Sequence, residues 1–245
     1  MPSHCEELSD CHQAIDAIIR GRYAARAFDE RPVSQNVIFE VLDAARHAPS
    51  GANIQPWRVY AVTGEKKREL SAALAKANAE ECDAHSSEYQ YYSSTLPEPY
   101  HARRAEFGRI FYGSLGIEQS DREARARQTA KNYHFFGAAI GLIVTIDRRL
   151  EKGSWLDLGM FLQNILIAAG SRGLQSCPQE TFSKYHRTLR EHLPIPPEEL
   201  VVCGISIGYA LDGLGPAPRL MPKVPVEHFA TFLGFEHETS SGEGS

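Results

Sequence analysis

Apolar residues recur at helical spacing in three parts of the chain. Near the N-terminus, Ile15, Ile18 and Ile19 predict a short helix after polar residues 1–12, which are expected to be loose. A second helix should follow Ser34, a good N-cap residue, because apolar side chains recur after it at i, i+3, i+4 spacing. The cleanest stripe consists of Leu158, Phe161, Leu162, Ile165, Leu166 and Ala169. The helix that carries this stripe should be central to the fold.

Shorter apolar runs predict three strands. Residues 59–62 alternate and end at a turn, and a polar helix over about 65–84 should follow. Residues 138–146 and 201–209 are continuously apolar, as buried strands are. No internal repeat or linker is visible, so we expect one α/β domain spanning residues 1–245.

Two regions depart from these patterns. Residues 85–130 are rich in tyrosine, arginine and proline and lack a long apolar face, which predicts a lid over a site. A surface insertion is the alternative. Residues 210–235 form a proline-rich extended arm that could embrace a second subunit, and the Ser, Gly and Glu tail at 236–245 should be disordered.

Composition narrows the class of protein. The 245 residues are 42% hydrophobic and 23% charged with a net charge of -5, which gives no basic bias toward nucleic acid. Five scattered cysteines without a CxxC pair fit reduced thiols and predict no metal site. No apolar run approaches the roughly 20 residues that span a bilayer, and no signal peptide is visible. We therefore expect a cytoplasmic protein without nucleic-acid or membrane partners.

A polar, punctuated stretch at 49–57 follows the second predicted helix. Two prolines bracket a Ser-Gly pair, and Pro56 disfavours helical dihedral angles at Gln55. The result should be a stiff turn whose backbone and amide side chains, including that of Asn53, can bind a planar ligand. A plain helix stop before a strand is the alternative.

Arginines gather in a second polar segment. Arg20, Arg22 and Arg26 lie within seven residues, a density that suits recognition of phosphate and other anionic oxygens. Solvated surface arginines are the alternative. The chain has no GxSxG, HExxH, P-loop or GxGxxG motif, so a cofactor would have to supply difficult chemistry. Arginines for a phosphate and amides for a heterocycle together suggest a mononucleotide such as flavin.

These segments carry a resemblance to a known family. Residues 22–28 are similar to the Arg-Arg-Ser-x-Arg-x-Phe start of the FMN-dependent nitroreductases, and residues 48–57 to their Ala-Pro-Ser-x-x-Asn-x-Gln-Pro-Trp turn. Residues 162–174 resemble the central helix of that family, and residues 204–209 its last core strand. The matches run in order from about residue 14 to about 235, and they point to the nitrobenzoate-reductase-like subgroup.

The resemblance implies a fold and an activity. The fold would be a mixed central sheet flanked by helices, in an intertwined homodimer with two FMN molecules at its interface. NADH or NADPH would pass hydride to the flavin N5 and leave, and an electron-poor aromatic substrate would then take two electrons per turn, from nitro to nitroso to hydroxylamine. Positioning of both reactants would be the main task of the protein, which supplies no catalytic side chain of its own.

The same resemblance assigns FMN contacts. Arg22 and Lys223, with Arg219 less directly, would bind the phosphate, and Arg26 would face the pyrimidine edge of the flavin, where a fixed cation stabilises negative charge. Backbone amides near Glu180 would face N5, and Ala24 replaces the serine that is usual in the family. The remaining implied contacts are Tyr23, Pro49, Ser50, Gly51, Asn53, Gln163, Pro178, Gln179 and Thr181, of which the residues at 49–53 would serve the flavin of the other subunit.

Candidate substrate contacts come from aromatic and basic residues. The rings of Phe135, Phe136, Tyr89 and Tyr112 could sandwich an aromatic substrate, and packing is the alternative for each. The lid arginines could bind a substrate carboxylate, as in a nitrobenzoate; they are Arg103, Arg104 and Arg109.

Other functions remain open at this level. A reductive dehalogenase, a quinone or enone reductase, or a flavin-fragmenting enzyme would use the same flavin contacts. The dehalogenases that resemble this family use a lid lysine, yet no lysine occurs between Lys76 and Lys131. A non-catalytic FMN-binding protein is an alternative of another class.

Overall fold

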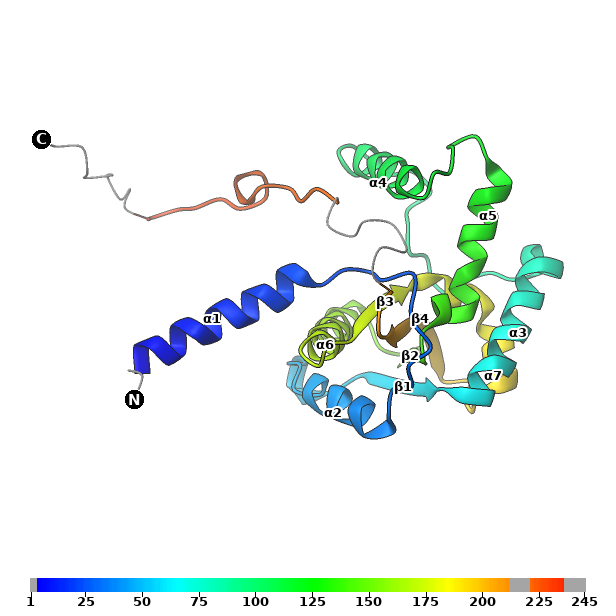
Figure 1. Cartoon of the computed structure of the whole chain (residues 1–245), viewed down its shortest axis with the longest axis horizontal. Helices are drawn as coiled ribbons and strands as arrows, with labels where there is room; N and C mark the ends of the chain where they lie inside the picture. The colour runs from blue at the N-terminus through cyan, green and yellow to red at the C-terminus, as the bar shows by residue number, and fades with distance from the viewer. Residues whose placement is uncertain (1–3, 212–220, 236–245) are drawn as a thin grey trace, which may run out of the picture.

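A four-stranded antiparallel sheet lies at the centre of the molecule (Figure 1). The computed structural model describes residues 4–211 and 221–235. The strands are β1 (Trp57–Val62), β2 (Ile140–Asp147), β3 (Gln175–Gln179) and β4 (Glu199–Gly208), in the order β1-β2-β4-β3. All neighbouring strands pair antiparallel, with a register shift in β2 between Val144 and Thr145.

The arginine segment extends this sheet beyond β3. Ala24 forms a parallel bridge with Ser176, and the Ala25 backbone N–H donates to the Ser176 carbonyl at 3.1 Å. Phe28 forms an antiparallel bridge with Ala210. Within the described residues, the parallel component of the expected mixed sheet is therefore confined to the bridge at Ala24.

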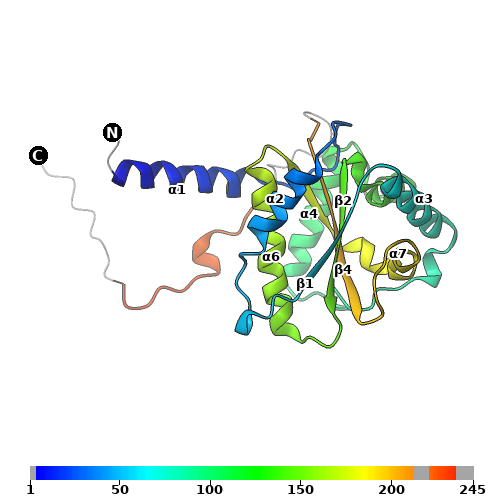
Figure 2. The ribbon, with the colours of Figure 1, turned by 90° about the horizontal axis from the view of Figure 1, so that it is seen from below.

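Helices cover both faces of the sheet (Figure 2). One face carries α2 (Gln35–Ala45) and α6 (Lys152–Gly170), and the other carries α3 (Gly64–Glu80) and α7 (His186–His192). Ser34 caps α2 as expected, because its hydroxyl accepts the Val37 backbone N–H at 3.3 Å. The central position predicted for the helix at 158–169 is confirmed by α6, whose apolar stripe is buried against the sheet.

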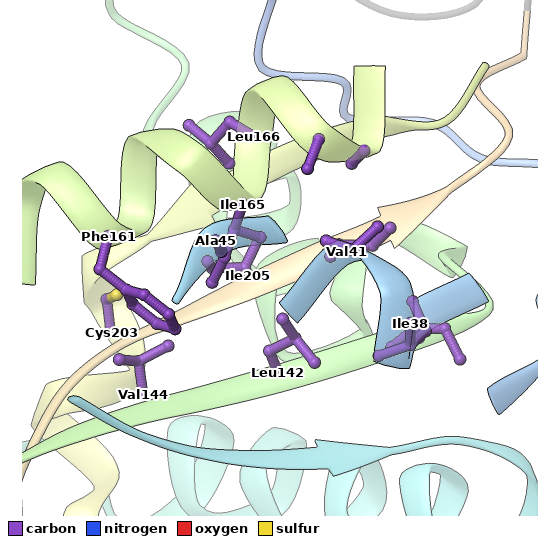
Figure 3. Close-up of a cluster of buried hydrophobic side chains, with 14 of the residues drawn as sticks. Ile38, Val41, Ala45, Leu142, Val144, Phe161, Ile165, Leu166, Cys203 and Ile205 are labelled. Atoms are coloured by element: carbon purple, nitrogen blue, oxygen red, sulfur yellow. The ribbon is translucent and has the colours of Figure 1, made fainter. Parts of the chain in front are cut away.

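The core divides into two clusters because side chains of a strand alternate between faces. Leu142 and Val144 of β2 pack under α2 and α6, as Figure 3 shows, while Ile143 between them joins the cluster on the other face. Trp57 at the start of β1 stacks on Phe161 of α6 with ring centroids 4.6 Å apart. The sheet and α6 therefore form one rigid unit on which the remaining segments are mounted.

The N-terminal helix is longer than its apolar stripe. Helix α1 spans His4–Gly21, so residues 4–12, expected to be loose, are helical. Glutamates and leucine in this stretch are good helix formers, which favours continuation of the helix. Both α1 and residues 221–235, which include a single turn η6 (Val226–His228), extend away from the body on the same side (Figures 1 and 2).

The region expected to form a lid contains two helices, α4 (Tyr100–Ser114) and α5 (Arg122–Ala130). Short 3-10 turns complete the described structure: η1 (Gly51–Asn53), η2 (Cys82–Ala84), η3 (Lys131–Gly137) and η4 (Glu180–Tyr185). Phe111 is the only buried residue of α4, so this helix is loosely tied to the core. None of the described helices is long and apolar enough to cross a membrane.

Candidate functional site

A cavity of about 1180 Å³ lies where three separate segments meet. The end of α1 with residues 22–26 forms one wall, the outer face of α4 forms the second, and residues 221–224 form the third. Five of the residues that the resemblance assigns to FMN line this cavity: Arg22, Tyr23, Ala24, Arg26 and Lys223. Arg219 and the tail at 236–245 lie outside the described residues.

The arginine segment is fixed by the edge of the sheet. Its bridge to Ser176 holds the backbone, and Nη1 of Arg26 donates to the Ala24 carbonyl at 3.2 Å. The Arg26 guanidinium also lies over the Phe111 ring of α4, 4.7 Å from its centroid. Burial raises the pKa of the neighbouring Cys177 thiol to about 11, although the charges of Arg26 and Arg22 oppose that rise. This cysteine is therefore a protonated core residue and not a nucleophile.

Positive charge predominates in the cavity. Arg22, Arg103 and Lys223 line it, and among the described residues no carboxylate lies within ion-pair distance of any of the three. The only acid of the wall, Glu106, pairs with Arg109 at 2.8 Å on the lid helix itself. The cavity can thus bind an anion that carries two or more negative charges.

The stretch at 49–57 is a turn under backbone strain. Ala52, Asn53 and Gln55 have φ values of 49°, 59° and 51°, in the left-handed region that costs a non-glycine residue about 1 kcal/mol or more. Several hydrogen bonds hold it, among them those from the Gln55 N–H to the Ser50 hydroxyl at 3.0 Å and from the Gly51 N–H to Asp157 of α6 at 3.1 Å. The predicted departure from helical geometry at Gln55 is confirmed.

This turn does not line the cavity of its own chain. Pro49 and the residues of η1 are exposed, and the turn packs against α6 instead. Gln163, also on α6, is exposed and lies outside the cavity wall. The implied flavin contacts at 49–53 and Gln163 are therefore separate from those that line the cavity.

At residues 178–181, where β3 ends, most side chains are already engaged within the protein. Gln179 is 3% exposed, with its amide held by Asn132 and its side-chain carbonyl oxygen accepting from Ser206, so this side chain is engaged within the protein. The Thr181 hydroxyl is paired with Tyr133 at 2.9 Å. Pro178 is exposed, and the Glu180 carboxylate accepts from Ser183. What remains at 178–181 is the backbone, which is the part that the sequence implied.

The substrate contacts assigned to two phenylalanines are wrong. Phe135 is completely buried and stacks on Phe182 with centroids 4.7 Å apart, and Phe136 is 8% exposed in the same core cluster. Consecutive left-handed residues, with φ of 52° and 53°, turn the chain inward at this point. The Phe135 ring fills the space above Gly141, where a side chain would collide with it. The strand predicted from 138 consequently begins at Ile140.

The other predicted substrate contacts also lie outside the main cavity. Tyr89 donates its hydroxyl to the Val202 carbonyl at 2.7 Å and packs on Trp155, beside a second cavity of about 280 Å³. Tyr112 has the Arg125 guanidinium 4.8 Å from its ring centroid. Arg109 forms the exposed pair with Glu106.

The lid contributes a different set of residues to the cavity: Arg103, Glu106 and Phe107. These positions are three and four residues apart, so they share one face of α4. Of these three residues, only Arg103 was a candidate contact in the sequence analysis. Recognising residues 100–114 as a helix would have grouped them.

Comparison with known proteins was made over the whole chain. The Nitroreductase family model matches residues 19–209. The 4-nitrobenzoate reductase of Pseudomonas putida is 39% identical over 222 residues, which are 91% of this chain and 96% of that protein. Nitrobenzene nitroreductase of Ectopseudomonas oleovorans is 40% identical over 219 residues, 89% of this chain and 96% of that protein. The crystal structure of the FMN-dependent nitroreductase NfnB from Mycobacterium smegmatis in complex with NADPH has a TM-score of 0.86 at 30% identity, covering 91% of this chain and 99% of that one.

Proposed function

The chain belongs to the Nitroreductase family, and from this premise we propose that it is an FMN-dependent enzyme that reduces nitroaromatic compounds with NADH or NADPH. The observation that carries the proposal is the convergence of Arg22, Arg26 and Lys223 on one cavity beside the edge of the sheet. FMN supplies the redox chemistry when it is bound, by accepting hydride at N5 and returning two electrons to the nitro group.

The cavity fits a flavin phosphate and leaves further room. Its volume of about 1180 Å³ exceeds the roughly 300–1000 Å³ of typical ligand pockets. We assign the phosphate to Arg22 and Lys223, because their charges are not neutralised by a carboxylate in the described part of the chain. Arg26, fixed between Ala24 and Phe111, provides a positioned cation for the pyrimidine edge of the flavin.

The backbone at 178–181, which is not part of the cavity wall, would supply further contacts to the flavin. The side chains of Glu180 and Thr181 are engaged by Ser183 and Tyr133, so their contribution comes from backbone amides of a rigid 3-10 turn. Such preformed donors cost no reorganisation when a ligand binds.

A homodimer would complete the site. Residues 49–53 do not reach the cavity of their own chain, and they would serve the flavin of the partner instead. Large apolar side chains are exposed on segments that extend from the body: Ile15, Ile19, Phe229, Phe232, Leu233 and Phe235. Surfaces of this kind are typical of interfaces between subunits. Light scattering of the purified protein should give twice the 27.2 kDa of the chain, and a monomer that retains FMN would contradict the dimer.

The cellular location that we propose is the cytoplasm. Cys11, Cys82, Cys177 and Cys203 are all free thiols, as expected under reducing conditions.

Stopped-flow spectroscopy of the purified yellow protein tests the proposed activity. Anaerobic NADH or NADPH should bleach the flavin absorbance, and a nitroaromatic compound should then restore it. Flavin that neither nicotinamide bleaches would favour a non-catalytic FMN-binding protein. Bleaching followed by reoxidation with quinones or halogenated phenols, but not with nitroaromatics, would favour the other reductase activities.

A further inference from the structure

The lid helix presents a cation to the cavity in addition to those assigned to the flavin. We propose that Arg103 binds the carboxylate of the substrate, so that the enzyme prefers nitroaromatic acids to neutral nitroaromatics. This inference rests on the proposed function and names the substrate class that the same site selects. Arg103 lies on the face of α4 that also carries Glu106 and Phe107, and all three line the cavity.

The other cations of the cavity wall have partners in the chain or proposed roles in flavin binding, whereas Arg103 has no proposed role in flavin binding. Arg22 and Lys223 match the charge of about -2 on one phosphate group. Arg26 is held by the Ala24 carbonyl and the Phe111 ring, and Arg20 pairs with Asp16 at 3.3 Å. Within the described residues, Arg103 has no carboxylate at ion-pair distance, and Glu106 beside it is already paired with Arg109. An anion from outside the chain would therefore be the natural partner of Arg103.

The other lid arginines are engaged elsewhere. Arg109 forms a forked ion pair with Glu106, with distances of 3.0 and 2.8 Å. Arg104 stacks its guanidinium 4.8 Å from the ring centroid of Tyr92 and does not line the cavity. The structure thus selects one of the three lid arginines.

The surroundings of Arg103 suit an aromatic acid. Its guanidinium carbon lies 5.6 Å from the ring centroid of Tyr100, which steadies the side chain and leaves its N–H fork open for a bidentate carboxylate. Phe107, one turn further along α4, is 43% exposed and is supported from behind by Phe111 at 5.5 Å. A flat apolar surface next to a forked cation matches a ring that carries a carboxylate.

The comparisons do not decide this point. One relative is named for an anionic nitroaromatic and another, of similar identity, for nitrobenzene, which is neutral. The preference has to come from residues of this chain.

The test compares 4-nitrobenzoate with its methyl ester, which keeps the ring and nitro group and removes the charge. The readout is the ratio of kcat/KM for the acid to kcat/KM for the ester, in the FMN-loaded full-length protein. Wild type should favour the acid, and Arg103→Gln should lower the ratio by roughly 10- to 100-fold, as expected for a lost charge-assisted hydrogen bond, mainly through KM. Arg104→Gln, a neighbour of the same charge outside the cavity wall, should leave the ratio at the wild-type value.

A second measurement does not depend on turnover. Benzoate, titrated into the oxidised wild-type flavoprotein, should perturb the flavin absorbance at a lower concentration than methyl benzoate does, and Arg103→Gln should abolish that difference. This titration still decides the proposal if neither nitro compound is reduced, an outcome that would refute the proposed activity instead. Equal loss of acid and ester reduction in Arg103→Gln would overturn the proposal and assign Arg103 to the flavin. Slower bleaching by NADPH with an unchanged acid-to-ester ratio would also overturn it.

Discussion

The guanidinium carbon of Arg26 lies 4.7 Å from the centroid of the Phe111 ring, so a residue next to the sheet edge is directly covered by the lid helix. Phe111→Leu removes the ring and keeps most of the apolar volume. Because a cation over an aromatic face is worth about 0.5–2 kcal/mol, we expect FMN affinity to fall by a matching amount when Arg26 loses its support. Fluorescence titration of the apoprotein with FMN measures the change. Phe111→Tyr keeps the ring and should bind FMN like wild type; equal affinity in the Leu variant would separate the lid from flavin binding.

Arg22 provides a more direct test of the phosphate assignment. Arg22→Ala should weaken FMN binding by about 1–3 kcal/mol, because a charge-assisted hydrogen bond to the phosphate is lost. Arg46→Ala is the matched control, since this exposed side chain pairs with Asp43 and lies outside the cavity wall. The same titration compares the two variants. An unchanged dissociation constant in Arg22→Ala would remove Arg22 from the phosphate role.

Glu88 ties the start of the lid to the core and should confer a pH dependence. Its carboxylate lies 2.9 Å from Arg148 and 2.9 Å from Arg190. Burial raises the pKa of Glu88, but the hydrogen bond from Arg148 and the charges of His186 and Arg190 outweigh it and hold the pKa below its usual range. A lowered carboxyl pKa stabilises the fold above the unfolded-state pKa of about 4.3, and that stabilisation is lost as pH falls through the folded-state pKa.

The corresponding variant is Glu88→Gln. It should lower the free energy of unfolding by about 1–3 kcal/mol at neutral pH, because two arginines lose a charged partner, and the deficit should shrink below about pH 4. Urea denaturation at several pH values measures both effects. Glu81→Gln, which neutralises an exposed carboxylate 3.6 Å from His85, should cost at most about 0.5 kcal/mol. A deficit for Glu88→Gln that stays constant with pH would show that charge is not its source.

Two glycines should respond to alanine in opposite directions. A Cβ on Gly204 of β4 would lie 2.5 Å from the Phe182 ring, which is fully buried, so Gly204→Ala should destabilise the protein by about 1–3 kcal/mol. A Cβ on Gly113 of α4 would meet nothing within 4 Å, so Gly113→Ala should raise helix stability by about 0.5–1 kcal/mol. Thermal denaturation followed by circular dichroism compares them. Equal midpoints for both variants would contradict the close packing at Phe182.

The sequence was a good guide wherever one face of an element is buried. Periodic apolar residues located α6 and the N-cap at Ser34, because burial of one face imposes the period. It failed at Phe135 and Phe136, because the consecutive left-handed residues and the burial of both rings leave no periodic signal in the sequence. The helical residues before the apolar stripe of α1 were missed because their polar sequence carries no apolar periodicity.

The sequence identified residue types that suit the ligand, but it did not show which face of α4 lines the cavity. Arg22, Arg26 and Lys223 line one cavity, and the bridge at Ala24 ties the segment of the two arginines to the sheet edge. Their roles in flavin binding stay predictions. The choice between Arg103 and Arg109 depends on how α4 is rotated about its axis. Its apolar residues are scattered around the helix, so sequence alone does not set that rotation.

The weak attachment of α4 has an evolutionary consequence. A wall of the cavity is built on a helix whose only buried residue is Phe111, while the sheet and α6 carry the folding energy. Substitutions at Arg103, Glu106 or Phe107 should therefore change what is bound at little cost to the stability of the fold. Selection could then adapt the substrate range of this chain through α4 without first acquiring compensating mutations in the core.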